Sequence, residues 1–213
     1  MDSLGMKPEE IETESFRIID EEAGEHGWPA GEWPVVRRIV HTSADFEYVN
    51  SMIISDGAID RATAALRGGA AIVTDTNMAL SGISKPRLTP FGCTVACHVA
   101  DPDVAELAKR EGITRSIAAM RKAVANKNNR VFVIGNAPTA LFELLRLLKT
   151  GEASADLIVG LPVGFVGAEE SKIALAGIGC DCQTPFITNM GRKGGSNVAA
   201  AVINALAIMA SGN

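Results

Sequence analysis

Residues 130–148 read RVFVIGNAPTALFELLRLL, and this stretch decides the fold class. Its first six residues are mostly β-branched or aromatic, which is typical of a short buried strand. Gly135, Asn136 and a proline interrupt the run, and a leucine-rich segment of helical length follows over Thr139–Leu148. A short strand joined to a helix in this way is the unit from which α/β domains are built.

The same alternation extends to both sides of this unit. Short apolar runs are separated by amphipathic segments of helical length, an order that predicts right-handed crossovers and a mainly parallel sheet. We therefore expect an α/β fold with about five parallel strands flanked by helices. The other strands are expected at 70–75, 93–97, 155–160 and 185–189, and the helices at Asp56–Leu66, Asp101–Lys109, Thr114–Ala125, Ala168–Leu175 and Ser196–Met209.

The first 35 residues are predicted to add an N-terminal helical segment and a loop. Pro8 and the acidic residues after it are typical of a helix start. A loop rich in Gly, Trp and Pro follows, and then Val36, Ile39 and Val40 recur at helical spacing, so a second helix should end near His41. No change of composition marks a linker after residue 35, and residues 1–213 are expected to form a single domain.

Composition and charge exclude several classes of protein. A chain of 213 residues with 47% hydrophobic residues can bury one substantial core. A net charge of -5 argues against a nucleic-acid partner or a membrane surface, both of which favour a basic excess. The N-terminus lacks the pattern of a signal peptide, and the apolar stretch Val198–Ala210 is shorter than the roughly 20 residues of a membrane span. We expect a cytoplasmic protein in which this stretch is a buried helix.

The four cysteines occur as Cys93 with Cys97 and as Cys180 with Cys182. Neither spacing is that of a zinc knuckle, and an acidic intracellular chain normally keeps such thiols reduced. A metal site drawn from these thiols and His98 would lack a recognised ligand spacing, so no metal is expected.

Ligands of parallel α/β sheets gather outside the carboxyl ends of the strands. The loops that leave these ends are rich in Gly or Asn, and they are the candidate walls of a site. They read TDTNMALSG, IGNAPTA with Asn136, VGLPVGFVGAEESK and TNMGRKGGSN.

The last of these loops places Arg192 and Lys193 before Gly194, Gly195 and Ser196, which is expected to cap the final helix. Converging backbone amides and a helix N-terminus attract anions, so the loop could cradle a carboxylate or a phosphate. A turn that carries a solvated basic pair explains the string equally well. The string is neither a Walker loop nor GxGxxG, which disfavours a dinucleotide-dependent oxidoreductase.

Residues 37–48 read RRIVHTSADFEY, and His41 in this string has three interpretations. A histidine at the end of an apolar helix is most often a packed or capping residue, but it can also be a metal ligand or a proton donor. Arg38 shares its helix face. Ser43 does not indicate a hydrolase triad, because no GxSxG is present. The residues alone therefore indicate an α/β domain with an anion-friendly ligand site.

Six strings, in order between residues 11 and 206, carry a resemblance to a known family. Through them the chain resembles the precorrin-8X or cobalt-precorrin-8 methylmutase family of cobalamin biosynthesis. GNAPTALFELL and LPVGFVGAEESK are specific strings rather than generic turns. The other four are RRIVHTSADFEY, GAAIVTDTNMALSGI, ITRSIAAM and GRKGGS.

The resemblance implies an α/β homodimer with a site near the subunit interface. It implies an isomerase that moves a methyl group of a ring-contracted tetrapyrrole from a bridging carbon to the adjacent ring carbon, without an organic cofactor. The product is hydrogenobyrinic acid or its cobalt counterpart. The family's proton donor matches His41, and its substrate-contacting serine and arginines match Ser15, Arg38 and Arg115.

The residue types agree with this chemistry. Protonation of a ring nitrogen would change the electron demand of the macrocycle, and histidine titrates where such a donation is practical. Arginine can bind the carboxylates of the macrocycle bidentately. Further substrate contacts are expected from Asn136, Arg192, Lys193, Gly194, Gly195 and Ser196.

Three alternatives stay open. A non-catalytic corrinoid carrier would carry the same site residues, and the sequence does not distinguish a metal-free from a cobalt-bound substrate. The string GIGCDCQTPF departs from the family's motifs. Its Cys180 and Cys182 are either ordinary thiols or have a role of their own, such as contact with cobalt or redox sensing.

Overall fold

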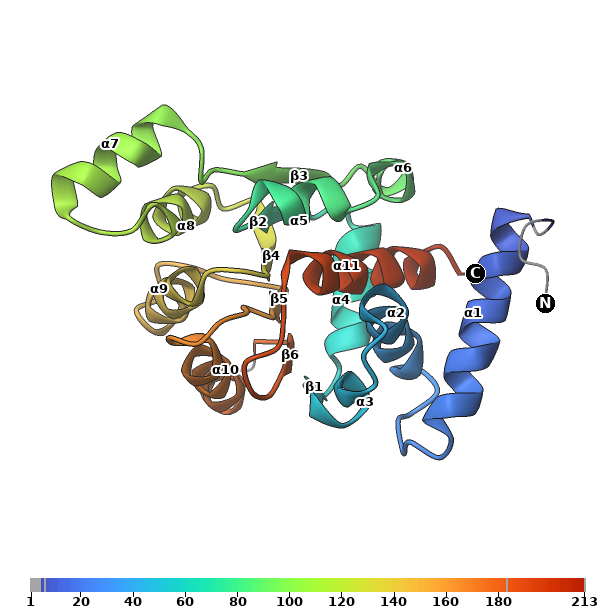
Figure 1. The fold of residues 1–213 in the computed structure, drawn as a ribbon. Helices are drawn as coiled ribbons and strands as arrows, with labels where there is room; N and C mark the ends of the chain where they lie inside the picture. Colours follow the sequence, from blue (N-terminus) through green and yellow to red (C-terminus); the bar gives the residue numbers. More distant parts are fainter. Residues whose placement is uncertain (1–4, 6, 183, 213) are drawn as a thin grey trace.

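A six-stranded sheet forms the centre of the computed structural model, which describes residues 5, 7–182 and 184–212 (Figure 1). The strand order is β1-β6-β5-β4-β2-β3. The strands from β2 to β6 pair in parallel, and β1 runs antiparallel to β6 at one edge. The strands are β1 (Met52–Ile54), β2 (Ala71–Thr74), β3 (Thr94–Cys97), β4 (Asn129–Ile134), β5 (Leu157–Gly160) and β6 (Phe186–Asn189).

The predicted α/β class and its five parallel strands are confirmed, but the prediction missed β1. This strand is three residues long and too short to show a period of its own. Its extended conformation is set by its partner, since Met52 lies opposite Asn189 and Ile54 lies opposite Ile187. Tertiary pairing rather than local sequence therefore decides this edge.

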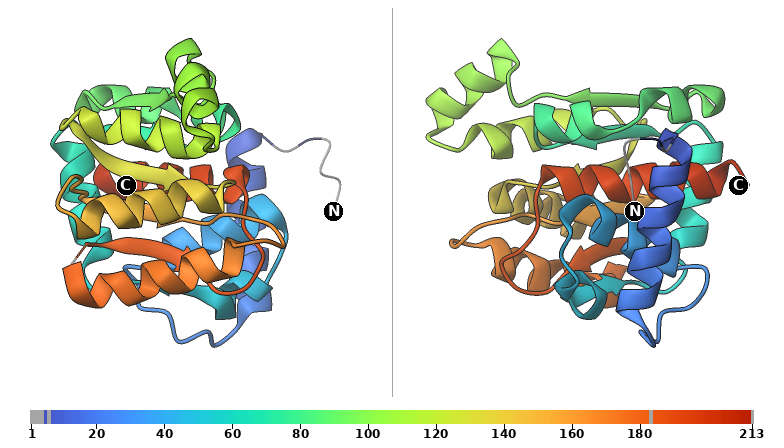
Figure 2. Two further views of the ribbon diagram at one scale, coloured as in Figure 1. Left: turned by 90° about the vertical axis from the view of Figure 1, so that its left-hand side faces the viewer. Right: turned by 45° about the vertical axis from the view of Figure 1, so that its right-hand side comes forward.

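Helices cover both faces of the sheet. The helices α2 (Trp33–Ser43), α4 (Ala58–Arg67), α5 (Asn77–Gly82) and α11 (Ser196–Ala210) pack together on one face. The helices α8 (Arg115–Ala125), α9 (Pro138–Lys149) and α10 (Ala168–Cys182) lie side by side on the other (Figure 2). At the two ends, α1 (Pro8–Ala23) packs on α2 and α7 (Pro102–Glu111) packs on α8, while α3 (Glu47–Ser51), α6 (Lys85–Leu88) and a 3-10 turn (Thr89–Phe91) are short connections.

The predicted helix over Ala168–Leu175 is seven residues too short, since α10 continues to Cys182. Gly177 and Gly179 lower the helix propensity of this stretch by roughly 1 kcal/mol each relative to alanine. Packing of α10 against α9 and β6 sustains the helix in spite of them. The side chains of Cys180 and Cys182, whose role the sequence left open, lie outside the described residues.

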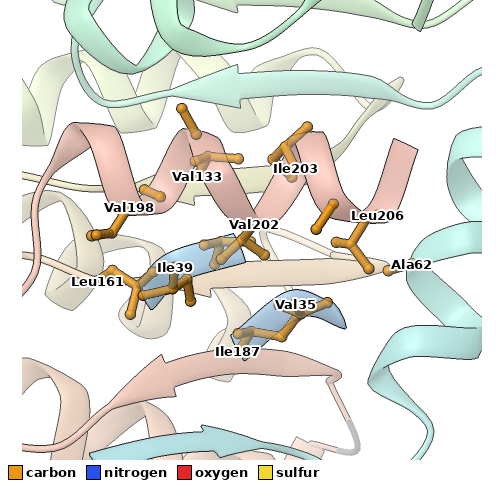
Figure 3. Close-up of a cluster of buried hydrophobic side chains, with 14 of the residues drawn as sticks. Val35, Ile39, Ala62, Val133, Leu161, Ile187, Val198, Val202, Ile203 and Leu206 are labelled. Atoms are coloured by element: carbon orange, nitrogen blue, oxygen red, sulfur yellow. The ribbon is translucent and has the colours of Figure 1, made fainter. Parts of the chain in front are cut away.

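The helix α11 is buried, as its sequence predicted. Val202 and Ile203 at its middle are fully buried, and its residues pack against Val35 and Ile39 of α2 (Figure 3). A helix that is apolar all round needs partners on every side, and here they are α2, α4, α5 and the sheet. None of the helices in the described part of the chain is both long enough and apolar enough to cross a bilayer.

The packing of α2 fixes which of its residues remain accessible. Val35, Val36, Ile39 and Val40 are buried against the core, whereas His41 in the last turn is exposed. The helix ends at Ala44, whose left-handed backbone (φ 53°) turns the chain away toward α3. This turn brings the residues that follow His41 back over the carboxyl end of the sheet.

Candidate active site

The carboxyl end of the sheet has a topological switch point between β2 and β4. From β2 the chain continues to β3 on one side, and it returns to place β4 on the other side. A crevice at such a point is the usual ligand site of an open α/β sheet. The loops that leave β2 and β4 border this crevice.

Asp75, which directly follows β2, fills this crevice. Its carboxylate accepts the backbone amides of Gly135 at 3.0 Å, Asn136 at 2.9 Å and Ala137 at 2.7 Å. The side chain is almost completely buried, and burial raises the pKa of Asp75 while the three amide bonds oppose this shift. The amides at the start of α9, which could otherwise bind a ligand anion, are thus occupied by the protein's own carboxylate.

The start of α11 closes the same region from a second side. The hydroxyls of Thr76 and Ser196 lie 2.8 Å apart in a hydrogen bond. Gly135 has no room for a side chain, since a Cβ there would lie 2.6 Å from the Cα of Ser196. The hydroxyl of Ser196 therefore has a hydrogen-bond partner inside the protein. It does not cap α11, whose N-cap residue is Gly195 and which has no side-chain cap. The predicted capping role of Ser196 is wrong, because its hydroxyl is held by Thr76.

The loop 190–195, between β6 and α11, is held against the loop after β5. A Cβ on Gly194 would lie 2.2 Å from the carbonyl oxygen of Leu161, and the amide of Gly195 donates to that oxygen at 2.9 Å. The amide of Gly164 in turn donates to the carbonyl oxygen of Arg192 at 3.2 Å. The two glycines thus serve close backbone contact between two loops.

The two basic residues of this loop differ in their partners. Arg192 is exposed and has no carboxylate partner among the described residues, and its guanidinium lies 5.6 Å from the ring centroid of Phe165, whose side chain is 85% exposed. Lys193 instead forms ion pairs with Asp45 at 2.5 Å and Glu47 at 2.9 Å. These pairs tie the segment after His41 to the loop, and they leave Arg192 as the cation of the two that is free to meet an anion.

His41 and Arg38 lie one turn apart on α2 and share an aromatic neighbour on α1. The ring centroid of Phe16 lies 5.1 Å from that of His41 and 4.6 Å from the guanidinium of Arg38. Arg38 also pairs with Glu12, and this hydrogen bond lowers the pKa of Glu12. Ser15, next to Phe16, donates its hydroxyl to the carbonyl oxygen of Ile11 at 2.7 Å. Ser15, Arg38 and His41 therefore lie along the same α1–α2 seam.

A cavity of about 330 Å³ opens beside Arg38. Glu12 is the one acidic residue of its lining, against three arginines, so its surface is basic. The lining residues are Glu12, Phe16, Pro34, Arg37, Arg38, Arg87, Ala205, Ile208 and Met209.

Arg115 begins a helix on the other face of the sheet from this seam, and Asn136 follows β4 at the carboxyl end of the sheet. Arg115 is the first residue of α8, is exposed, and follows Thr114, which caps the helix by accepting the amide of Ile117 at 3.2 Å. Asn136 is exposed at the end of β4, and its amide is one of those that Asp75 accepts. Figure 1 shows α8 and α1 at opposite ends of the molecule, so one chain does not bring Arg115 together with Arg38 and His41.

The described thiols show no gathering of metal ligands. Cys93 and Cys97 are free, and burial raises the pKa of each. His98 instead forms a hydrogen bond with Asp101 at 2.9 Å. Within the described part of the chain, no group of three or more His, Cys, Asp or Glu side chains is placed to hold a metal ion.

Two residues of this region were not predicted from the sequence. Asp75 and the fully buried Lys172 of α10 both stood in loops named as site walls, TDTNMALSG and VGLPVGFVGAEESK, but neither residue was given a role. A charged residue directly after a buried strand, as Asp75 is, was the available signal for the first. Nothing in the local pattern around Lys172 distinguishes it from a solvated lysine.

Residues 10–209 match the family described as precorrin-8X methylmutase. The chain belongs to this family. It is 46% identical to the cobalt-precorrin-8 methylmutase of Priestia megaterium, over 97% of this chain and 90% of that protein. It is 42% identical to the precorrin-8X methylmutase of Pseudomonas aeruginosa, over 92% of this chain and 93% of that protein. The crystal structure of precorrin-8X methylmutase from Thermus thermophilus superposes with a TM-score of 0.85 at 39% identity, covering 95% of this chain and 98% of that one.

The family membership confirms the resemblance found in the sequence, and with it the expectation of an isomerase that acts as a methylmutase in cobalamin biosynthesis. The structural similarity to the Thermus thermophilus protein, which extends over nearly the whole of both chains, also confirms the predicted α/β fold. Relatives named for the metal-free and for the cobalt-bound substrate are both similar to this chain, so the choice between them stays open.

Proposed function

We propose that the chain moves a methyl group within precorrin-8X or cobalt-precorrin-8, and that His41 donates the proton that makes the migration possible. The observation that carries this proposal is the exposed imidazole of His41 beside Arg38, with Phe16 packed between the two helices. An exposed histidine whose neighbours are an aromatic ring and an arginine can reach a bound ligand. A histidine that merely filled the core would be buried like Ile39 and Val40.

The reaction would use the protein's groups in a simple order. Arginines first hold the carboxylates of the macrocycle, which fixes the ring over the α2 end. His41 then protonates a ring nitrogen, so that electron density is drawn from the carbon that receives the methyl group, and it recovers the proton when the product forms. The net change is a migration within one molecule, so no organic cofactor or oxidant is needed.

The carboxylates of the substrate are expected to meet the cations that lack strong partners. Arg192 and Arg115 are exposed and have no ion pair among the described residues. Arg38 pairs with Glu12, but it lies at a cavity whose lining holds three arginines against this one carboxylate. Lys193 would contribute less, because Asp45 and Glu47 already neutralise its charge. Ser15, Asn136, Gly194, Gly195 and Ser196 remain proposed contacts or supports of the same site.

We further propose that the working form is a cytoplasmic homodimer. Two observations support it: Arg115 lies far from His41 within one chain, and apolar side chains stay exposed at the carboxyl end, including Met78, Phe165 and Val166 at 71%, 85% and 89%. A second copy would cover such side chains and could supply the distant arginine. Light scattering at micromolar concentration should then give twice the 22.3 kDa of the chain, and a monomeric mass would contradict the dimer.

A parallel assay tests the function against the alternative of a corrinoid carrier. The protein is incubated with a large excess of precorrin-8X and, separately, of cobalt-precorrin-8, and the absorbance is followed. Product formed far in excess of the protein supports the isomerase, and the faster substrate identifies the natural form. A complex that forms one to one and keeps the spectrum of the substrate would favour the carrier.

A further inference from the structure

Lys172 is a charged side chain in the interior of the protein, one turn into α10. It is fully buried, and no carboxylate lies within ion-pair distance of its ammonium among the described residues. The ammonium donates instead to the carbonyl oxygen of Lys193 at 2.6 Å and to the side-chain oxygen of Asn189 at 3.2 Å. A buried charge without a counter-charge is costly, so its retention calls for an explanation.

Both partners of Lys172 belong to the connection from β6 to the loop 190–195. Asn189 is the last residue of β6, and its side-chain amide also donates to the carbonyl oxygen of Lys193, at 3.0 Å, and to that of Met190 at 3.0 Å. Two buried side chains thus converge on one carbonyl oxygen. That oxygen lies between Arg192 and Gly194, in the middle of the loop.

The rest of the loop depends on this point of attachment. Its other hydrogen bonds with the body of the protein are three backbone bonds, in which Met190 donates to Ser51, Gly195 donates to Leu161 and Gly164 donates to Arg192, and the largely exposed ion pairs of the Lys193 ammonium. Exposed ion pairs contribute only about 0–1 kcal/mol. The buried ammonium is therefore the strongest single donor that holds the loop down onto the sheet.

We propose that Lys172 is a positioning residue, whose ammonium fixes the loop 190–195 so that Arg192 faces the carboxylates of the substrate. This inference rests on the proposed function and deepens it, because it names the group that pre-orders the anion-binding loop. Lys172 does not touch the substrate itself. Its positive charge also lies beneath the loop, where it favours the binding of an anion above.

Pre-ordering of the loop has a measurable consequence for binding. If the loop is in the binding-competent conformation only a tenth of the time, the apparent dissociation constant rises about tenfold. The chemical step, which depends on His41 at another element, should change little. Loss of the ammonium should therefore raise KM and leave kcat nearly unchanged.

The test replaces Lys172 by methionine, which keeps the length and apolar stem of the side chain but removes the charge. Three quantities are measured in the full-length protein. They are kcat and KM with precorrin-8X, the affinity for hydrogenobyrinic acid by absorbance titration, and the rate of tryptic cleavage after Arg192 and Lys193. Lys109→Met, on the exposed part of α7, is the matched control for the loss of one positive charge.

In Lys172→Met we expect KM and the dissociation constant of the product to rise about tenfold, kcat to stay within about threefold, and cleavage in the loop to accelerate at least about tenfold. The melting temperature should stay level or rise, because an apolar replacement removes the desolvation cost of the buried charge. A residue with a merely structural role would instead lower the melting temperature and kcat together. Lys109→Met should resemble the wild type in every quantity.

Unchanged cleavage and unchanged KM in Lys172→Met would overturn the proposal, and so would faster cleavage without any loss of binding. If the wild type itself neither binds nor converts the tetrapyrrole, the proposed function fails, and the cleavage rates still decide whether Lys172 holds the loop. Should Lys172→Met not fold, Asn189→Ala removes the second donor to the same carbonyl oxygen and must show the same changes in smaller degree.

Discussion

The carboxylate of Asp75 accepts the backbone amide of Ala137 at 2.7 Å, which joins the end of β2 to the start of α9 across the switch point of the sheet. Together with the bonds from Gly135 and Asn136, it replaces a ligand anion by a fixed internal one. The site that this family uses is therefore expected nearer to the α1–α2 seam and the loop 190–195 than to the crevice between β2 and β4.

Asp75→Ala should destabilise the fold by about 3 kcal/mol, because it leaves three backbone amides without an acceptor and those of Gly135 and Ala137 are buried. Asp75→Asn should lose less, since one carbonyl oxygen remains. Asp56→Ala, at an exposed aspartate, is the control and should stay within about 0.5 kcal/mol. Urea unfolding of the three variants measures the differences, and a wild-type-like Asp75→Ala would show that water replaces the carboxylate without cost.

His41→Asn should lower kcat at least about a hundredfold, the lower end for loss of a general acid, while the melting temperature hardly moves. The side chain is exposed, so its replacement removes little packing. Steady-state assays of the wild type and of His41→Asn decide the matter, and a His41→Asn enzyme with most of its activity retained would refute proton donation.

Arg38→Ala and Arg115→Ala should each raise KM more than they lower kcat. A cation that holds a carboxylate equally in the ground state and the transition state contributes to binding alone. The effect of Arg115 should weaken with added salt, because the side chain is exposed. Arg110→Ala, on exposed α7, serves as the control. If KM stays constant in both site variants, neither arginine contacts the substrate.

Lys172 should make the stability of the fold depend on alkaline pH. Burial lowers the pKa of Lys172 to about 8, so between pH 8 and the ordinary range of lysine the unfolded chain binds more protons than the folded one. The cost of burying the charge therefore disappears as pH rises through that window, and the free energy of unfolding increases by about 3 kcal/mol in total. The wild type should gain this amount relative to Lys172→Met between pH 7.5 and 10.5, measured by urea unfolding.

Lys122 and Lys193, whose pKa values are raised by their carboxylate partners, lose their stabilising charge only above the ordinary range of lysine, beyond this window. They are present in both proteins, so their effect cancels in the difference. A difference that does not change with pH would mean that the ammonium of Lys172 is solvated.

Gly194→Ala should destabilise the fold by about 1–3 kcal/mol, because its methyl group would overlap the carbonyl oxygen of Leu161. Gly177→Ala is a matched control, since a Cβ there meets nothing within 4 Å and α10 gains a better helix former. Thermal unfolding should show opposite signs for the two variants. Equal and small shifts would indicate that the loop 190–195 can move away from Leu161.

The sequence determined the architecture because its signals there are local. Runs such as RVFVIG and the helical segments between them fixed five parallel strands, the buried character of α11 and the loops at the carboxyl end. Specific strings fixed the family, which composition and periodicity alone could not. The edge strand β1 escaped because three residues carry no period and take their conformation from β6.

Only the tertiary structure decided what the charged residues of the site do. Lys193 and Arg192 are neighbours in one string, yet the first is neutralised by Asp45 and Glu47, whereas the second has no carboxylate partner in the part of the chain that the structure describes. The bond between Lys172 and the Lys193 carbonyl joins residues 21 positions apart, and the Asp75 bonds span 60 to 62 positions. The energy of a charge depends on its burial and on partners that are distant in the sequence. Both are set by the tertiary fold and cannot be inferred from the local sequence pattern.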